Sequence, residues 1–494
     1  MLVESLGALA SRDRRHDVCV IGSGPAGATL AHALGRAGLS VILLEAGRAS
    51  RDERSQAVYE GDFFGAPLLL PLAASRMRQF GGTSTIWAGR CRPIDAADFD
   101  AKVEGVDTAW PIGKPELDAW LPQAASILEL PVFGPESPFG ELRELAYRYS
   151  PPVDFALKFG DEFRRSRRID VALDSYVTGF DVDGGRVVHA RVRDSSGIER
   201  QVAARRFVVC AGGIENSRLL LWANVQSGGR VVPEPAALGR YWMAHPHFRL
   251  GHVLLEDDLP FEFDEKGNVL LAPSPAAMRA HGILGIGLAL RPADEDSQRG
   301  LIADLACVAP ELGAKILRRF GRRLSCGLEL RASWEQPPRP YNRVVLADRR
   351  DAFGIPRSDL HWYLEDFDRR TPRIAAGILG AELAARGIGR VRLERWLDGL
   401  EDFPEDHDSG GGHHMGGTRM SRDPRQGVVD PDCRVHGIGN LYVGGSSVFP
   451  SAGFADPTLT IVQLALRLAD HLARSLARDG EQDGTLHVRA EAPR

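Results

Sequence analysis

Two adjacent histidines, His413 and His414, stand between a run of three glycines and a second glycine pair. A neutral imidazole titrates near physiological pH, so either side chain could take a proton from a substrate hydroxyl. With His407 they could instead bind a metal ion, but the stretch has neither a cysteine nor the H-x-x-x-H spacing of a zinc site. A surface histidine in a glycine loop is the remaining alternative. We expect acid–base chemistry and no metal, provided that a cofactor lies beside this segment.

The segment 17–47, DVCVIGSGPAGATLAHALGRAGLSVILLEAG, predicts a dinucleotide-binding strand–turn–helix–strand unit. Gly22 permits the tight turn, Gly24 allows a pyrophosphate to approach the backbone, and Gly27 allows the helix and strand to pack closely. The N-terminus of the helix supplies N–H groups and a partial positive charge for the phosphates. Glu45 ends the second strand, where its carboxylate can accept hydrogen bonds from the ribose hydroxyls of an adenosine.

The distribution of further glycine-rich segments favours FAD over NAD as the ligand. A NAD-binding fold completes its site with a second mononucleotide half soon after the first, and no second fingerprint follows here. The other glycine-rich signals lie far apart along the chain, at 78–95, 206–221, 412–418 and 443–460. A site assembled from such distant segments suits a long, extended ligand such as FAD.

In these segments the sequence resembles the glucose–methanol–choline family of oxidoreductases. The matching stretches include the fingerprint ending in LLEAG, GGTSTIWAG, CAGGIENSRLLL, LGRYWMAHP, HHMGGTRM and ADPTLTIVQLALRLADHL. They occur in the family's order over nearly the whole chain. The resemblance implies an α/β fold in which a Rossmann-like FAD-binding domain is interleaved with a substrate domain built on an antiparallel sheet. It also implies the oxidation of an alcohol.

The resemblance assigns catalytic candidates. The family's H-x-x-G-T motif is matched by His414, Gly417 and Thr418, which makes His414 the expected base. Ahead of the last helix the family has Asn or His, whereas this sequence has Asp456. Asp456 could accept a hydrogen bond from the substrate, or it could cap a helix that begins at Pro457. Both roles stay open.

The predicted last helix has an apolar stripe and a polar face. Its N-terminus should point at the flavin edge that becomes negative on reduction. The apolar stripe contains Leu459, Val462, Leu466, Ala469 and Ala473, and the polar face contains Gln463, Arg467, Asp470 and Arg474.

Further cofactor contacts follow from position in the matching motifs, and each one alone is more often a turn or core residue. The candidates are Gly81, Gly82, Thr83, Trp87, Val177, Ala211, Gly212, Gly445, Ser446, Pro457 and Thr458. In pyranose oxidases, which have a similar GG-x-S-T-x-W stretch, a histidine bonded to the flavin occupies the position of Ile86. Ile86 cannot form that bond, so we expect non-covalent FAD.

Composition limits the remaining possibilities. A chain of 494 residues predicts two domains, and we place the FAD-binding domain at 16–100, 170–240 and 405–478 and the substrate domain at 101–169 and 241–404. A net charge of −5 gives no reason to expect a nucleic-acid partner, and no apolar run approaches the roughly 18 residues of a membrane span. Six cysteines without a C-x-x-C pair indicate a reducing, cytoplasmic compartment.

The expected activity is FAD-dependent oxidation of an alcohol, with a sugar, glycoside or other polyol as substrate. The electron acceptor, oxygen or another molecule, cannot be read from the sequence. A lyase of the hydroxynitrile type, in which the flavin is structural, is one alternative. A non-catalytic redox subunit is another.

Overall fold

A six-stranded parallel sheet of order β1-β9-β3-β2-β13-β21 forms the first half of the molecule in the computed structural model. The structure describes residues 1–9, 16–66, 70–101, 107–255, 260–292, 325–404 and 412–489. The strands of this sheet are β1 (Leu2–Val3), β2 (His16–Ile21), β3 (Val41–Leu44), β9 (Ile169–Ala172), β13 (Ala204–Val209) and β21 (Leu441–Val443).

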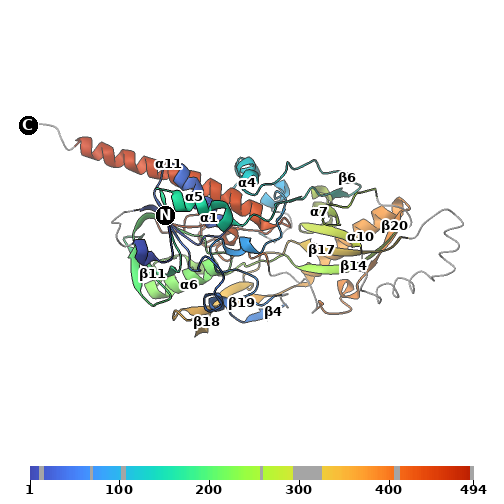
Figure 1. Cartoon of the computed structure of the whole chain (residues 1–494). Coiled ribbons are helices and arrows are strands. Elements are labelled where there is room, and N and C mark those ends of the chain that lie inside the picture. Colours follow the sequence, from blue (N-terminus) through green and yellow to red (C-terminus); the bar gives the residue numbers. More distant parts are fainter. Residues whose placement is uncertain are drawn as a thin grey trace, which may run out of the picture.

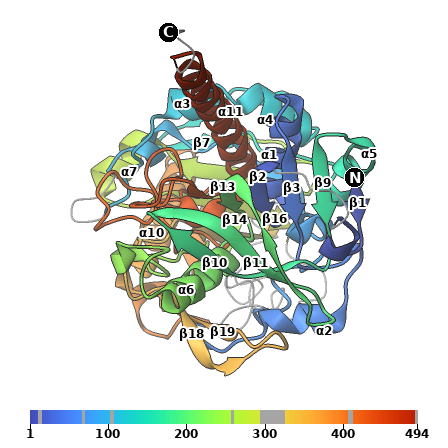
Figure 2. The same ribbon diagram turned by 90° about the vertical axis from the view of Figure 1, so that its left-hand side faces the viewer.

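Helices and a smaller sheet bury this parallel sheet, which is why its central strands contain continuous apolar runs, such as Val18–Ile21 in β2 and Val41–Leu44 in β3. Helix α1 (Pro25–Arg36) packs against β2, β3 and the last helix, α11 (Pro457–Arg489). Figure 2 shows α11 above the parallel strands, and in Figure 1 its far end extends away from the rest of the chain. An antiparallel sheet of β10 (Tyr176–Asp183), β11 (Arg186–Arg193) and β12 (Glu199–Val202) contacts β13 through β11.

A seven-stranded sheet forms the second half (Figure 1), and all of its strand pairs are antiparallel. In spatial order its strands are β20 (Gly389–Leu393), β14 (His247–Leu255), β17 (Ser325–Trp334), β16 (Ile286–Pro292), β15 (Val269–Pro273), β7 (Leu142–Glu144) and β6 (Pro138–Phe139). Helix α10 (Asp366–Ala385) buries an alanine- and leucine-rich face in the same core cluster as this sheet. The parallel sheet with its helices and the separate antiparallel sheet confirm the expected fold class, while the exact domain limits stay a prediction.

Short elements complete the chain. The two small sheets consist of β18 (Arg343–Arg350), β19 (Pro356–Trp362) and β4 (Phe63–Gly65), and of β5 (Arg90–Cys91) and β8 (Arg148–Tyr149). Among the described residues, the other α-helices are α2 (Glu53–Gln56), α3 (Lys114–Asp118), α4 (Leu121–Ile127), α5 (Phe155–Arg165), α6 (Glu215–Ser227) and α7 (Pro275–His281). Within the described ranges, no helix has the length and apolar character needed to cross a bilayer.

Candidate active site

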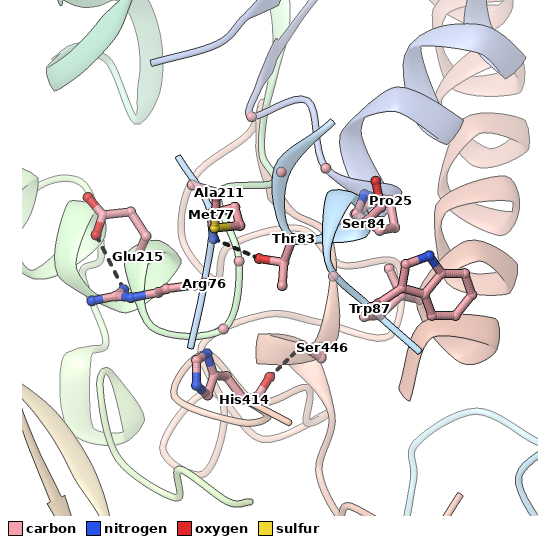
Figure 3. A pocket seen from close by; sticks show the side chains of 18 of the residues that line it. Pro25, Arg76, Met77, Thr83, Ser84, Trp87, Ala211, Glu215, His414 and Ser446 are labelled. Atoms are coloured by element: carbon pink, nitrogen blue, oxygen red, sulfur yellow. Dashed lines mark hydrogen bonds and ion pairs between the residues drawn. The ribbon is translucent and has the colours of Figure 1, made fainter. Parts of the chain in front are cut away.

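A pocket of about 960 Å³ opens where β2, β3, β13 and β21 end. The carboxyl ends of parallel strands are where open α/β sheets bind ligands. Segments far apart in the sequence line the pocket, among them the glycine turn after β2 and the start of α11. In Figure 3, Pro25 and His414 lie on opposite sides of the view, with Thr83 between them.

The glycine turn between β2 and α1 has the geometry that a pyrophosphate needs. Gly22 has φ +102°, and a Cβ there would lie 2.5 Å from the Cys210 carbonyl oxygen. A Cβ on Gly27 would lie 1.8 Å from the oxygen of Gly22, so this glycine serves helix packing and does not line the pocket. Gly24 faces open space, its nearest would-be neighbours being 4.0 Å away, and no side chain within the described chain caps α1 there. Uncapped N–H groups at a helix N-terminus bind phosphate.

Glu45 lies in the pocket where an adenosine ribose is expected. Its Oε2 accepts from the backbone N–H (3.0 Å) and hydroxyl (2.6 Å) of Ser23, and its Oε1 accepts from the N–H of Gly47 (2.7 Å). The hydroxyl of Ser23 also accepts from the N–H of Gly81 at 3.1 Å. These bonds hold the acid and join the fingerprint turn to the GGTSTIWAG loop.

That loop forms one wall of the pocket as the short 3₁₀ helix η3 (Gly82–Thr85). Thr83 is held by a hydrogen bond from the N–H of Met77 (3.1 Å), and Trp87 donates to the carbonyl of Val153 (3.0 Å). Gly81 does not line the pocket. It has φ +89°, and a Cβ there would meet the backbone nitrogen of Ala156 at 2.9 Å, so this glycine is needed for packing against Ala156.

Every other predicted site residue lines this pocket. They are Gly22, Gly24, Glu45, Gly82, Thr83, Trp87, Val177, Ala211, Gly212, His414, Gly445, Ser446, Asp456, Pro457 and Thr458. The pocket's volume, its phosphate-type glycine turn and the ribose-type acid Glu45 fit FAD. The individual contacts of these residues with the cofactor stay predictions.

Asp456 is buried, 6% exposed, and forms an ion pair with Arg90. Arg90 Nε donates to Oδ2 at 2.6 Å and a terminal nitrogen donates to Oδ1 at 3.1 Å. Burial alone raises the pKa of Asp456, but the guanidinium holds it well below its usual range. The carboxylate is therefore ionised and paired at neutral pH.

His413 and His414 lie in different surroundings. His413 Nε2 is 3.8 Å from Asp456 Oδ1, and its Nδ1 is 3.0 Å from Nδ1 of His245. The ring of His414 lies beside Trp242, with centroids 5.8 Å apart, and its Nε2 is 3.4 Å from Oγ of Ser75. His413, rather than His414, is the histidine beside residue 456.

Three imidazoles, those of His245, His247 and His413, form a cluster in which one ring nitrogen from each lies within 4.8 Å of the other two. Burial lowers the pKa of His413, although the Asp456 carboxylate opposes that shift. Burial, reinforced by His413, lowers the pKa of His245 to about 3 and that of His247 well below its ordinary value. All three rings are therefore neutral at pH 7. His407, the third histidine of the metal alternative, lies outside the described residues.

Sequence reasoning missed Arg90 and the role of His245. A signal existed for Arg90, because a carboxylate expected inside a pocket requires a cation and Arg90 directly follows the GGTSTIWAG motif. No comparable signal identified His245, whose contact with His413 joins residues 168 positions apart.

Known proteins share these features. Residues 338–465 match the family described as GMC oxidoreductase, and residues 15–60 match an FAD binding domain. The chain is 24% identical to the fructose dehydrogenase large subunit of Gluconobacter japonicus over 93% of its length and 98% of that protein. It is 31% identical to a C-glycoside 3-oxidase of Microbacterium trichothecenolyticum over 65% of its length and 57% of that protein.

A solved structure supports the fold. Pyridoxine 4-oxidase from Mesorbium loti superposes with a TM-score of 0.57 at 18% identity, covering 92% of this chain and 99% of that one. Together, the FAD-type pocket, the family matches and the full-length relatives identify the chain as an FAD-dependent alcohol oxidoreductase of the glucose–methanol–choline (GMC) family.

Proposed function

We propose that this enzyme oxidises a hydroxyl-bearing carbon of a carbohydrate or similar polyol to a carbonyl, with the imidazole of His413 accepting the hydroxyl proton. The observation that carries the proposal is the position of His413 Nε2, 3.8 Å from the Asp456 carboxylate in the pocket that begins at the glycine fingerprint. When bound, FAD supplies the acceptor for the hydride that leaves the same carbon, at N5 of its isoalloxazine.

The residues around His413 suit a base. The lowered pKa keeps the ring unprotonated at neutral pH and thus able to take a proton. Once it is cationic, the ring faces the Asp456 carboxylate, which stabilises the charge. Arg90 keeps that carboxylate ionised. The proton is held on His413 while the electron pair of the C–H bond leaves with the hydride, so the products are a carbonyl and a reduced cofactor.

Asp456 therefore supports the base in this proposal and does not act as a base itself. Its two oxygens accept hydrogen bonds from Arg90, and the capping alternative stays open beside this ion pair. His414, the base expected from the H-x-x-G-T frame, stays the second candidate because it lines the same pocket.

Named relatives support a hydroxyl-rich substrate. They include the fructose dehydrogenase large subunit, C-glycoside 3-oxidase and the 6'''-hydroxyparomomycin C oxidase of Streptomyces lividus, which is 26% identical over 94% of this chain. These names refer to fructose, to C-glycosides and to 6'''-hydroxyparomomycin C, and each names an oxidase or a dehydrogenase. They favour a hydroxyl-rich substrate for this chain.

An anaerobic screen of sugars, glycosides and simple alcohols tests the function. We expect at least one carbohydrate to bleach the oxidised-flavin absorbance of the purified enzyme, and simple alcohols to do so more slowly. Readmission of air then distinguishes an oxidase from a dehydrogenase. Release of an aldehyde from a cyanohydrin without bleaching would instead establish a lyase, and inertness towards every substrate with an artificial acceptor would favour a redox subunit.

The side chain of Ile86 supports non-covalent binding of FAD, because it excludes a covalent bond at this position. Ile86 lines the pocket and is 54% exposed, but its hydrocarbon side chain has no nucleophile. Acid precipitation is expected to leave the yellow cofactor in the supernatant. Flavin that stays with the washed pellet would refute non-covalent binding without affecting the assignment of FAD.

A further inference from the structure

We propose that His245 is a positioning residue that holds His413 in the one neutral tautomer able to accept a proton at Nε2. The catalytic consequence rests on the proposed function, in which His413 is the base. The tautomer itself is a property of this chain's hydrogen bonds and can be measured separately.

The direction of the hydrogen bonds is set at a backbone carbonyl. Nε2 of His245 lies 3.0 Å from the oxygen of Gly453. A carbonyl oxygen can only accept, so Nε2 of His245 carries the hydrogen. A neutral imidazole has a single N–H, which leaves Nδ1 of His245 as a lone-pair acceptor.

The contact between His245 and His413 then determines which nitrogen of His413 carries the proton. Nδ1 of His413 lies 3.0 Å from Nδ1 of His245, a distance at which one nitrogen donates and the other accepts. Since Nδ1 of His245 accepts, Nδ1 of His413 must carry the proton. Nε2 of His413 is then unprotonated and lies on the side of Asp456.

This direction requires a neutral His245, because an imidazolium would donate from both nitrogens and reverse the tautomer of His413. His245 is 1% exposed, and burial lowers its pKa to about 3, so it is neutral throughout the working range of an enzyme. The acceptor is also fixed in place. Gly453 has φ +56°, and a Cβ on it would meet the Asp98 carboxylate at 2.9 Å, so the loop that carries the carbonyl is tightly packed.

Without His245, His413 would be drawn to the opposite state. The ionised Asp456 carboxylate attracts an N–H, and His413 Nε2 is the ring nitrogen that lies 3.8 Å from it. A proton on Nε2 would occupy the lone pair that the reaction needs. His245 therefore opposes the electrostatic preference created by the ion pair on the other side of the ring.

Ring-nitrogen NMR of the FAD-loaded enzyme, labelled with ¹⁵N-histidine, tests the tautomer directly. The signals of His413 are identified as those lost in His413→Gln. We expect Nδ1 to be protonated and Nε2 to be bare in the wild type. His245→Asn, whose amide oxygen can accept in place of Nδ1, is expected to keep this pattern, whereas His245→Leu shifts the proton towards Nε2.

The rate at which an alcohol substrate reduces the flavin provides the second measurement. His245→Leu is expected to lower it on the order of 10²-fold with FAD content unchanged, and His245→Asn to restore most of that loss. His436→Asn is the matched control. Its Nε2 donates to the carbonyl of Ser421 at 3.0 Å outside the pocket, and reduction should be unaffected.

Two results would overturn the inference. One is a proton on Nε2 of His413 in the wild type, whatever the rates. The other is one transition-metal ion per chain that is lost in His245→Leu, since the three clustered imidazoles would then be ligands. If the tautomer is as expected but His413→Gln reduces at the wild-type rate, the proposed function fails while the positioning inference stands.

Discussion

Replacing His413 by glutamine is expected to slow flavin reduction by about 10²- to 10⁴-fold, the usual contribution of a general base. Glutamine is similar in length but cannot take a proton from a hydroxyl at neutral pH. FAD content should be unchanged, because the phosphate and ribose ends of the pocket lie at the fingerprint turn and Glu45. Stopped-flow reduction with a substrate from the anaerobic screen measures the effect.

His414→Gln is the matched comparison, because both histidines line the pocket and are adjacent in sequence. We expect it to lower the reduction rate less than His413→Gln does, since His414 contacts Ser75 and Trp242 rather than Asp456. The reverse order would make His414 the base, as the H-x-x-G-T frame predicts.

Arg90→Met is expected to lower the free energy of unfolding by about 3–5 kcal/mol at pH 7–8, because it leaves the Asp456 charge buried and unpaired. In the wild type the depressed pKa of Asp456 contributes stability that is present above the unfolded value of about 3.9 and lost only as the pH falls to the folded pKa. Without Arg90 burial dominates, and the pKa of Asp456 rises above its unfolded value. The variant then loses stability as the pH rises from the unfolded pKa of Asp456 to its raised folded pKa.

Urea unfolding of the FAD-loaded enzyme at pH 5 and pH 8 measures how the loss of stability in Arg90→Met depends on pH. The difference between the wild type and Arg90→Met should be larger at pH 8. The double variant Arg90→Met/Asp456→Asn removes the buried charge and is expected to regain most of the loss. A deficit that is equal at the two pH values, or that persists in the double variant, would show that Arg90 acts through packing alone.

The parts of the site that could be predicted are those under local constraint. In the turn after β2, Gly22 needs a left-handed φ and Gly27 needs close contact with the turn, so the residue types themselves report the geometry. FAD followed from the number and distance of such glycine-rich turns. These requirements act within a few residues and are therefore visible in sequence.

The orientation of side chains on irregular backbone could not be predicted. His413 and His414 are neighbours on a loop with no helical or strand period to say which side chain faces the substrate. Their directions depend on remote packing. A Cβ on Gly213 would meet the backbone oxygen of His414 at 2.3 Å, and Ser446 donates to that same oxygen at 2.5 Å.

The last helix shows the same limit. Leu459, Val462 and Leu466 are buried as its apolar stripe predicts, but Gln463 and Arg467 of the predicted polar face are buried as well. Gln463 donates to the carbonyl of Leu117 at 3.1 Å, and Arg467 Nε donates to Glu116 at 2.8 Å. A helix packed on two sides needs polar partners on its second face, and amphipathicity alone does not reveal them.

The place of β21 at the edge of the parallel sheet has a consequence for biosynthesis. A nascent chain that ends before Leu441 leaves the outer edge of β13 unpaired, and an exposed strand edge promotes aggregation. Such a chain also lacks the 445–458 wall of the pocket. We therefore expect the cofactor to bind only after residues 441–458 have been synthesised, so expression in riboflavin-starved cells should yield full-length apoprotein that takes up added FAD.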